Sequence, residues 1–368
     1  MEPKFPDQES LYLIMKWILR VVLIGFLLSG VFILRTVWLS GNFKTIKNSF
    51  SGTTQKIEGL PGVEDITIDQ STGIAFLSSD DRWSALLKKL PVKGAIYKLN
   101  LNDSVPQPVI LTDNFKQDDF HPHGISLFQT PEGKKIIFVV NHRKSGNFIE
   151  RFEYKNDSLQ HKESISDQLI ISPNDVAAVG ERVFYFTNDH DEKASGWRTF
   201  KDLLTIGTGN VCYYDGDRMN KTSIEGIKYA NGVNVSHDGK KLYVAATTDL
   251  KILVYDRDLA SGVLTKSNEI DTNTGVDNIE LDADGNLWVG CHPQLLKFLS
   301  HSKDETFISP SEIIKLTDSG DGKFQQQTVY VNDGSEISAS SVGAVYKKTM
   351  LIGPVFQRHF VLAREVDN

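Results

Sequence analysis

The chain has 368 residues, of which 40% are hydrophobic and 24% charged, a composition typical of an ordinary globular protein. Its formal net charge of -7 excludes the strongly basic surface of a nucleic-acid-binding protein, so we expect no nucleic-acid partner. The length is enough to bury a large core and permits roughly one to three domains.

Within the N-terminal segment, residues 1–41, the chain is mostly apolar from Leu11 to Leu39 and is broken by Lys16, Arg20 and Arg35. The unbroken apolar stretch is shorter than the roughly 20 residues that cross a bilayer, but Arg20 can snorkel and Trp38 suits the interface. A cleaved signal peptide is the competing interpretation, although no small-residue cleavage site follows. A buried core helix is the third. We predict an uncleaved signal-anchor or transmembrane helix.

Four Asn-X-Ser/Thr sequons follow this segment, at Asn102, Asn156, Asn220 and Asn234. They favour a single-pass membrane glycoprotein whose main domain is lumenal or extracellular. The protein would be secreted if the segment were cleaved. The sequence does not indicate an oligomeric state.

Residues 42–57 are polar and predict a linker, and residues 58–368 show no further break in composition, so they predict one domain. Within it, short apolar strands of one kind recur roughly 45–60 residues apart, as blades of a β-propeller do. They begin at Gly73, Lys135, Arg182, Lys241, Asn286 and Thr349. We therefore predict an all-β, six-bladed β-propeller, because the rival β-sandwich does not explain the recurrence.

Three further features belong to this fold. A strand near Gln55–Leu60 is expected to complete the last blade, which is otherwise built from residues 341–363. The stretch from Asp191 to Thr208 predicts a short amphipathic helix on one face, as a lid, a membrane contact or simple packing. Cys212 and Cys291 each lie in an apolar run and predict two buried, reduced thiols rather than a disulfide framework.

Five short polar phrases recur ahead of the repeated strands, at the same relative position in five successive units. They read Val63-Glu64-Asp65, Pro122-His123-Gly124, Pro173-Asn174-Asp175, Ala230-Asn231-Gly232 and Val276-Asp277-Asn278. If the units surround an axis, these side chains converge on it.

Carboxylate and amide oxygens are the ligands that calcium prefers. Because successive side chains of a strand point in opposite directions, adjacent pairs suggest two ion sites rather than one. One would hold Glu64, Asn174, Asn231, Asp277 and Asn278, and the other Asp65 and Asp175 with backbone carbonyls. A single Asn-Asp pair is more often turn chemistry, but recurrence in phase favours metal binding.

The chain resembles the paraoxonase/arylesterase family over residues 60–362. The resemblance is carried by PHGIS at 122–126, PNDVAAVG at 173–180, ANGVNVSHDGKKLYVA at 230–245 and VDNIELDADGNLWVGCHP at 276–293. It implies a six-bladed propeller with two axial calcium ions, one catalytic and one structural, that hydrolyses small-molecule lactones and aryl esters.

The resemblance places the catalytic-calcium ligands on Glu64, Asn174, Asn231, Asp277 and Asn278. It places the structural-calcium ligands on Asp65, Asp175 and the Ile125 carbonyl, and a histidine dyad on His123 and His142. One departure is that neither cysteine is placed for the disulfide by which mammalian members close the propeller.

With this assignment, His123 is expected to act as general base and His142 as the partner that orients it or relays its proton, with His190 and His292 in reserve. Two other readings stay open. One is a gluconolactonase or strictosidine synthase-like propeller, and the other is a non-catalytic, membrane-anchored calcium-binding scaffold.

Overall fold

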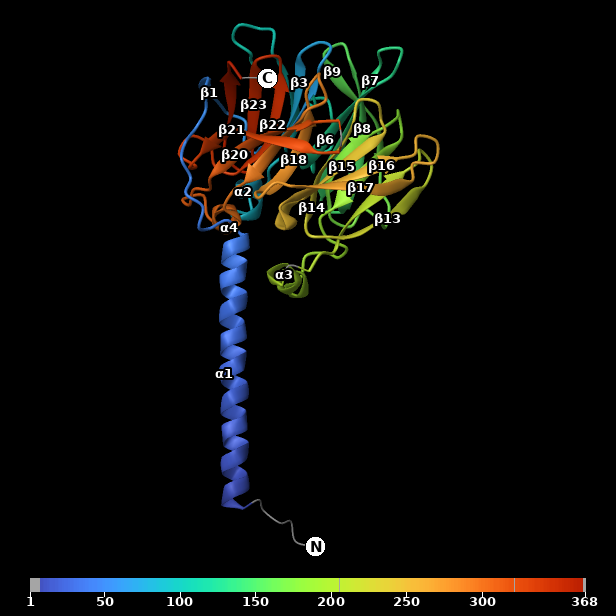
Figure 1. The fold of residues 1–368 in the computed structure, drawn as a ribbon. Coiled ribbons are helices and arrows are strands. Elements are labelled where there is room, and N and C mark those ends of the chain that lie inside the picture. The colour runs from blue at the N-terminus through green and yellow to red at the C-terminus, as the bar shows by residue number, and fades with distance from the viewer. Residues whose placement is uncertain (1–6, 205, 321, 367–368) are drawn as a thin grey trace.

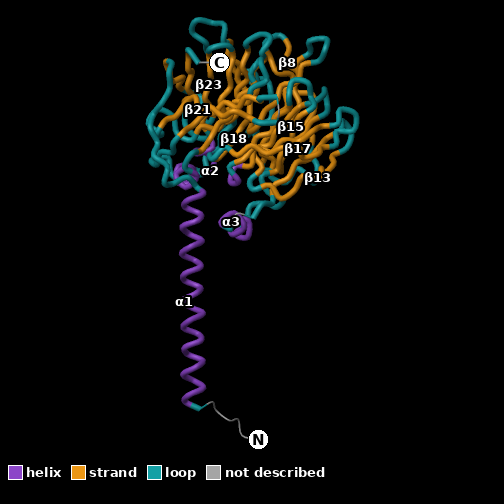
Figure 2. The backbone as a smooth tube through the Cα atoms, viewed as in Figure 1, coloured by secondary structure: helices purple, strands orange, loops and turns teal. Residues whose placement is uncertain are grey.

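The computed structural model describes residues 7–204, 206–320 and 322–366. Six four-stranded antiparallel sheets surround a common axis, with a long helix projecting from one face (Figure 1). The prediction of a six-bladed propeller is therefore confirmed. Figure 2 shows that strands make up the propeller and that the helices gather on the face from which the long helix leaves.

Each blade is built from four strands, and the first strand of each is innermost. Blade 1 contains β2 Val63–Asp69, β3 Ile74–Ser79, β4 Ala95–Asn100 and β5 Val109–Ile110, and blade 2 contains β6 Pro122–Gln129, β7 Lys135–Arg143, β8 Gly146–Lys155 and β9 Ser158–Ile165. Blade 3 contains β10 Pro173–Ala178, β11 Phe184–Asn188, β12 Gly209–Tyr214 and β13 Met219–Ile227, and blade 4 contains β14 Ala230–Val235, β15 Lys241–Ala246, β16 Lys251–Arg257 and β17 Leu264–Asp271. Blade 5 contains β18 Gly275–Leu281, β19 Leu287–His292, β20 Ser311–Asp318 and β21 Phe324–Asn332, and blade 6 contains β22 Ser340–Tyr346, β23 Thr349–Pro354, β24 His359–Arg364 and β1 Thr53–Glu58. The strands that begin at the recurring apolar runs are the second strands.

The innermost strands form a closed ring, since each contacts its two neighbours: β2, β6, β10, β14, β18, β22 and then β2 again. Buried apolar side chains fill the spaces between adjacent sheets. The cluster between the first and last blades, for example, contains Val63, Leu77, Leu351 and Phe360. Burying such side chains from water stabilises the blade interfaces.

The ring is closed by strand β1, which pairs antiparallel with β24 from Thr53–Arg364 to Glu58–His359. The prediction of a closing strand near Gln55–Leu60 is confirmed, and this strand overlaps the end of the segment expected as a linker. Cys212 and Cys291 are free and buried, as predicted. Closure therefore rests on the backbone hydrogen bonds between β1 and β24 and on packing, and β1 forms the exposed outer edge of the last sheet.

The long helix α1, Gln8–Leu39, is capped by Asp7 and buries none of its residues. It is apolar enough to cross a membrane by length and composition. Its C-terminal end is fastened to the propeller, because the Leu295 N–H donates to the Ser40 carbonyl at 2.9 Å.

The remaining helical segments all connect the second strand of a blade to its third. They are α2 Arg82–Leu86, α3 Gly196–Leu203, η1 Thr247–Asp249 and α4 Leu295–Lys303. They therefore lie at the same end of the propeller as α1 and as the beginnings of the innermost strands (Figure 1). The helix predicted within Asp191–Thr208 is α3, whose exposed Trp197 lies on this end; residue 205 lies outside the described residues.

Candidate functional site

Every innermost strand has an irregular register at the position of the polar phrase. The pairing shifts between Val63 and Asp65, Pro122 and Ile125, Pro173 and Val176, Ala230 and Val233, Val276 and Ile279, and Ser340 and Val342. A bulge leaves residues out of the ladder and turns their side chains away from strict alternation. The phrases therefore contact different partners because of bulges, and not through the simple alternation that the sequence argument assumed.

Two glycines in the phrases leave room for a close approach between neighbouring blades. A Cβ on Gly124 would lie 2.3 Å from Asp175 Oδ1, and one on Gly232 would lie 2.5 Å from the Asp277 carbonyl oxygen. Any larger residue would push the phrases apart. Pairs of adjacent blades are thus in direct contact at the level of the phrases.

We call Glu64, Asn174, Asn231, Asp277 and Asn278 the upper set. All five are buried, and the Asn278 amide donates to Glu64 Oε1 at 2.9 Å. Four of their side-chain oxygens are buried and accept no hydrogen bond from the described residues: Glu64 Oε2, Asn174 Oδ1, Asn231 Oδ1 and Asn278 Oδ1. Three of these residues are the middle residues of their phrases and Asn278 is the last residue of its phrase. Buried oxygens normally find a partner, so four orphaned oxygens from four blades need one.

Asp65 and Asp175, which we call the inner pair, differ in having their oxygens occupied. Asp65 accepts the N–H groups of Ile66 at 2.9 Å and Ile125 at 2.7 Å, and Asp175 accepts those of Val176 and Val233, both at 2.7 Å. Burial raises the pKa of both carboxyls well above the usual value. The charge of Glu64 raises the pKa of Asp65 further, and that of Asp65 does the same for Asp175.

Three hydroxyl groups fix the backbone of the phrases across blades. Thr187 donates to the Asn231 carbonyl at 2.6 Å, Thr247 to the Val276 carbonyl at 2.7 Å, and Ser341 to the Glu64 carbonyl at 2.6 Å. Ser341 lies in the sixth innermost strand, at the bulge that corresponds to the other five. The sixth blade thus supports the ring with a hydroxyl where the others supply a carboxylate, an amide or an imidazole.

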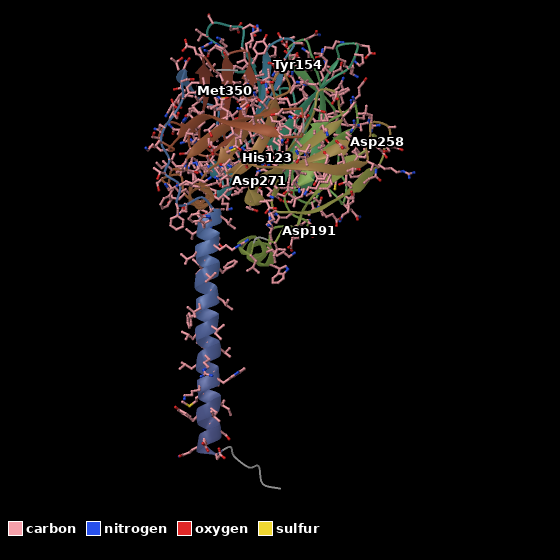
Figure 3. All side chains as sticks on the ribbon, in the orientation of Figure 1. His123, Tyr154, Asp191, Asp258, Asp271 and Met350 are labelled. Carbon is pink, nitrogen blue, oxygen red and sulfur yellow. The ribbon has the colours of Figure 1, made fainter. Side chains whose placement is uncertain are left out.

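The two histidines assigned as a dyad are in contact. His123 Nδ1 lies 2.9 Å from His142 Nε2, and His123 Nε2 lies 3.4 Å from Glu64 Oε1. Burial disfavours ionisation of Glu64, but His123 in its protonated form, through its charge and its Nε2–H, outweighs burial and lowers the pKa of Glu64 to about 2. Figure 3 shows His123 inside the propeller, nearer to α1 than Tyr154 and Met350 are.

The two reserve histidines lie beside acidic groups. His292 Nε2 is 2.7 Å from Asp277 Oδ2, and His190 Nδ1 is 3.0 Å from Asp189 Oδ1. Both rings are almost completely buried. His292 therefore orients a member of the upper set. Asp189, the partner of His190, also accepts a hydrogen bond from Arg198 of α3 at 3.2 Å.

The helix-bearing end adds a cation and an apolar cluster beside the site. The Arg82 guanidinium donates to the carbonyls of Gly62 at 2.9 Å, Pro122 at 3.0 Å and Val355 at 3.3 Å, which ties the starts of β2 and β6 to the end of β23. Next to it, Trp83 stacks on Phe356 with ring centroids 5.5 Å apart. Phe298 stacks on His292 at 4.0 Å, so this apolar cluster adjoins the upper set.

The donor chemistry of the upper set fits a hard divalent cation. No group of three His, Cys, Asp or Glu side chains suited to a metal occurs among the described residues. The upper set does not form such a group because three of its five residues are asparagines, which bind metals through amide oxygens. Two carboxylates with amide oxygens balance a double positive charge and match the preference of calcium.

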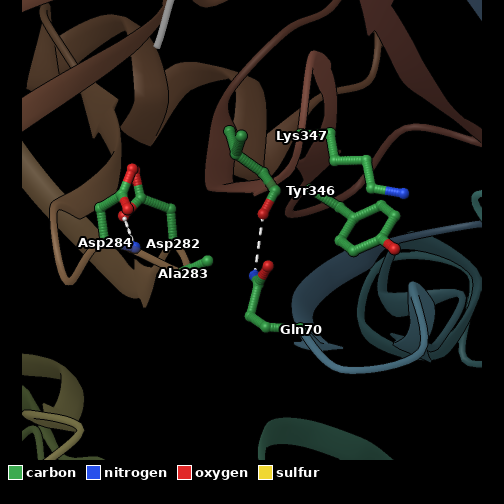
Figure 4. Close-up of a pocket in the computed structure, with 7 residues that line it drawn as sticks. Gln70, Asp282, Ala283, Asp284, Tyr346 and Lys347 are labelled. Carbon is green, nitrogen blue, oxygen red and sulfur yellow. Dashed lines mark hydrogen bonds between the residues drawn. The ribbon is translucent and has the colours of Figure 1, made fainter.

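A pocket of about 200 Å³ lies elsewhere, lined by Gln70, Asp282, Ala283, Asp284, Val345, Tyr346 and Lys347 (Figure 4). These residues follow the ends of β2, β18 and β22, so the pocket is at the opposite end of the propeller from the phrases. The Gln70 amide donates to the Val345 carbonyl at 2.9 Å, and Asp282 accepts the indole N–H of Trp288 at 2.9 Å. The first hydrogen bond joins two blades, whereas the second lies within the blade of β18 and β19. The pocket contains none of the predicted site residues.

Sequence reasoning missed Arg82, Thr187, Thr247 and Ser341, together with Asn147, whose Oδ1 lies 2.9 Å from His142 Nδ1. Ser341 alone carried a usable signal, since it precedes the sixth repeated strand as the phrases precede the other five. The others occupy no repeated position, and only the folded chain brings them to the site.

Comparison with known proteins gives a family and a fold. The family model described as Arylesterase matches residues 43–362. The human protein named serum paraoxonase/arylesterase 1 is 34% identical over 307 residues, covering 81% of this chain and 84% of its own. The rat protein named serum paraoxonase/lactonase 3 is 33% identical over 309 residues, covering 82% of this chain and 86% of its own.

Among solved structures, a luciferin-regenerating enzyme superposes with a TM-score of 0.53 at 14% identity, covering 85% of this chain and 95% of its own. A calcium-binding regucalcin from Agrobacterium tumefaciens gives a TM-score of 0.50 at 15% identity, covering 86% of this chain and 95% of its own. At such identities these similarities support the propeller fold and nothing finer.

Proposed function

The chain belongs to the arylesterase family, and on that premise we propose that it is a calcium-dependent hydrolase of lactones and aryl esters. Its relatives are named for paraoxonase, arylesterase and lactonase activities. The upper set would hold the catalytic calcium. The inner pair, with the Ile125 carbonyl, would hold a structural one.

The single observation that carries the proposal is the set of four orphaned oxygens in the upper set. Leaving a buried acceptor unpaired costs about 1–3 kcal/mol, so four of them in one layer are a standing penalty for the protein alone. A bound cation would satisfy all four. Among the residues that the structure describes, no group donates a hydrogen bond to any of these four oxygens.

Calcium bound to the upper set would polarise a substrate carbonyl and stabilise negative charge on its oxygen. The protein's own groups manage the proton. His123, in contact with both Glu64 and His142, would accept a proton from the attacking water. His292, hydrogen-bonded to Asp277 Oδ2, would hold that carboxylate with its other oxygen directed to the ion.

The apolar cluster of Trp83, Val355, Phe356 and Phe298 would contact the non-reacting part of the substrate. It adjoins Asp277 through the stack of Phe298 on His292. Apolar surface beside a small number of fixed polar groups is typical of small-molecule sites. A substrate with an aryl or alkyl group is therefore favoured over a strongly hydrated one.

The exposed helix α1 supports a membrane anchor, with the propeller on the lumenal or extracellular side. Three of the four sequon asparagines are exposed: Asn102, Asn156 and Asn220. Asn234 is partly buried on the innermost strand β14, and its amide donates to the Ile279 carbonyl at 2.7 Å. We expect glycans only on the first three, which mass spectrometry of the cell-expressed protein would map.

The decisive experiment measures hydrolysis by the detergent-solubilised full-length chain of γ- and δ-lactones of several chain lengths and of phenyl acetate. Asp277→Ala should lower kcat/KM on the order of 100-fold or more, because it removes one of the two carboxylates of the upper set. The matched control is Asp271→Ala, since that side chain is 78% exposed. Undiminished turnover by Asp277→Ala would exclude the proposed metal role.

His123→Gln tests the base separately from the metal. Turnover should fall by roughly 100-fold or more while calcium still raises the melting temperature. Unchanged turnover would remove His123 as the base. A chain that binds calcium but hydrolyses no lactone or aryl ester in the panel would be the non-catalytic scaffold instead.

A further inference from the structure

The far side of the His142 ring is held by an amide that the family resemblance did not point to. Asn147, on β8, faces His142, on β7, in the register of the sheet. Asn147 Oδ1 lies 2.9 Å from His142 Nδ1. The other end of the amide donates to the Ile171 carbonyl at 2.8 Å.

These two contacts fix which atom of the amide faces the histidine. A carbonyl accepts only, so the amide nitrogen must be the atom next to Ile171, and the oxygen must be the atom next to His142. The Ile171 carbonyl is itself held in place, because Asn188 Oδ1 accepts the N–H groups of Ile171 and Ser172, both at 3.0 Å. The amide cannot turn over without losing the hydrogen bond to the Ile171 carbonyl.

The amide orientation in turn sets the protons on both rings. An amide oxygen only accepts, so His142 carries its hydrogen on Nδ1, and its Nε2 is left with a lone pair. Burial lowers the pKa of His142 to about 4, with a further contribution from the charge of His123 when that ring is protonated, so the His142 ring is neutral near pH 7. His123 must then donate from Nδ1 to His142 Nε2 across the 2.9 Å contact.

His123 Nε2 is consequently the nitrogen without a hydrogen when the ring is neutral. It is also the nitrogen that faces Glu64 and the upper set, at 3.4 Å from Glu64 Oε1. The opposite tautomer of His142 would force the hydrogen of His123 onto Nε2. A base with its hydrogen on the reacting side cannot take a proton from water.

We propose that Asn147 is a positioning residue for the reaction, which holds His142 and through it His123 in the tautomers that leave His123 Nε2 free to accept a proton. The inference rests on the proposed function for its catalytic meaning. The tautomer of His142 that it predicts can be measured without any measurement of turnover. Asn147 also ties blade 2 to the segment that leads into β10, so a purely structural role is the alternative to be excluded.

The first test is a double-mutant cycle on the full-length chain with a lactone substrate. Asn147→Leu, nearly isosteric but without an acceptor, should lower kcat on the order of 10- to 100-fold and leave KM within about twofold. In a His142→Gln background the same substitution should change kcat by less than about twofold, since its effect passes through His142. An equal loss in both backgrounds would overturn the inference in favour of a structural role.

The second test needs no activity. With ¹⁵N-labelled histidine, the wild-type spectrum should show His142 as the Nδ1–H tautomer, and Asn147→Leu should shift it towards a mixture. Asn268→Leu, on the outermost strand β17, is the matched control and should leave the signal unchanged. A wild-type Nε2–H tautomer, or one unaffected by Asn147→Leu, would refute the inference. Absence of hydrolysis by the wild type with the Nδ1–H tautomer intact would instead count against the proposed function alone.

Discussion

The upper set and the inner pair lie in the same phrases, one residue apart, yet their oxygens are in opposite states. The four carboxylate oxygens of Asp65 and Asp175 all accept backbone N–H groups. In the upper set, four side-chain oxygens accept nothing from the described residues. Each oxygen of the inner pair already has one partner in the fold and a lone pair left for an ion, whereas the four oxygens of the upper set have no partner without a ligand.

The difference indicates how one propeller can combine rigidity with a reactive site. Oxygens that are already bonded by the backbone hold neighbouring blades in register, because Asp65 reaches Ile125 of the next blade and Asp175 reaches Val233 of the one after. Oxygens left unbonded keep their lone pairs for an ion. Stability and catalysis are thus assigned to adjacent residues in two of the phrases, Glu64 and Asp65 in one and Asn174 and Asp175 in the other.

Removal of calcium gives the largest expected effect on this comparison. Titration of the full-length chain with a chelator should lower lactone hydrolysis on the order of 10²- to 10³-fold, the several kcal/mol that a Lewis acid contributes. The melting temperature should fall only at higher chelator concentration, when the ion at the inner pair is lost. Turnover and melting followed on the same samples would separate the two. Loss of both at one concentration would contradict the division between the two layers.

A pair of neighbouring substitutions tests the division within one phrase. Asp175→Ala leaves the N–H groups of Val176 and Val233 buried without an acceptor, so we expect a loss of about 2–6 kcal/mol in the free energy of unfolding. Asn174→Ala removes an oxygen that bonds nothing in the fold, so stability should change by less than about 1 kcal/mol while turnover falls at least tenfold.

Urea denaturation in the presence of a chelator, together with lactone turnover in calcium, measures both effects. Adjacent positions and the same replacement make each variant the control of the other. If Asn174→Ala destabilised the chain as much as Asp175→Ala, the oxygens of the upper set would also belong to the scaffold.

The blade count and the identity of the phrases could be predicted from the sequence because both repeat along it. The repeated strands fixed six units, and the phrases before them are the residues that fold into the bulges of the ring. The reason given for two sites, strict alternation, was wrong in detail. Asp277 and Asn278 are adjacent, yet one contacts His292 and the other Glu64, as a bulge allows.

The supporting residues could not be predicted because their role depends on contacts between strands and blades. Asn147 looks like a turn residue after Gly146, and only the pairing of β7 with β8 brings it to His142. Thr187 and Thr247 resemble any strand-end threonine until the next blade places a carbonyl beside each hydroxyl. Such contacts have no period in the sequence.

The smallest effect is expected from a substitution in the sixth blade, whose bulge carries Ser341 where the other blades carry the residues of the phrases. This substitution tests whether that blade takes part in the upper set. Ser341→Ala removes a hydrogen bond to the Glu64 carbonyl, but the Asn278 amide still donates to that carbonyl at 3.0 Å. The carbonyl is not orphaned, so unfolding should become easier by only about 0.5–1.5 kcal/mol. Turnover should fall a few-fold at most, because Glu64 keeps its contacts with Asn278 and His123.

Ser335→Ala, at an exposed turn residue, is the control, and denaturation and turnover measure the outcome. A loss of turnover comparable with that of Asn174→Ala would place Ser341 among the groups of the upper set, which would then come from five of the six blades.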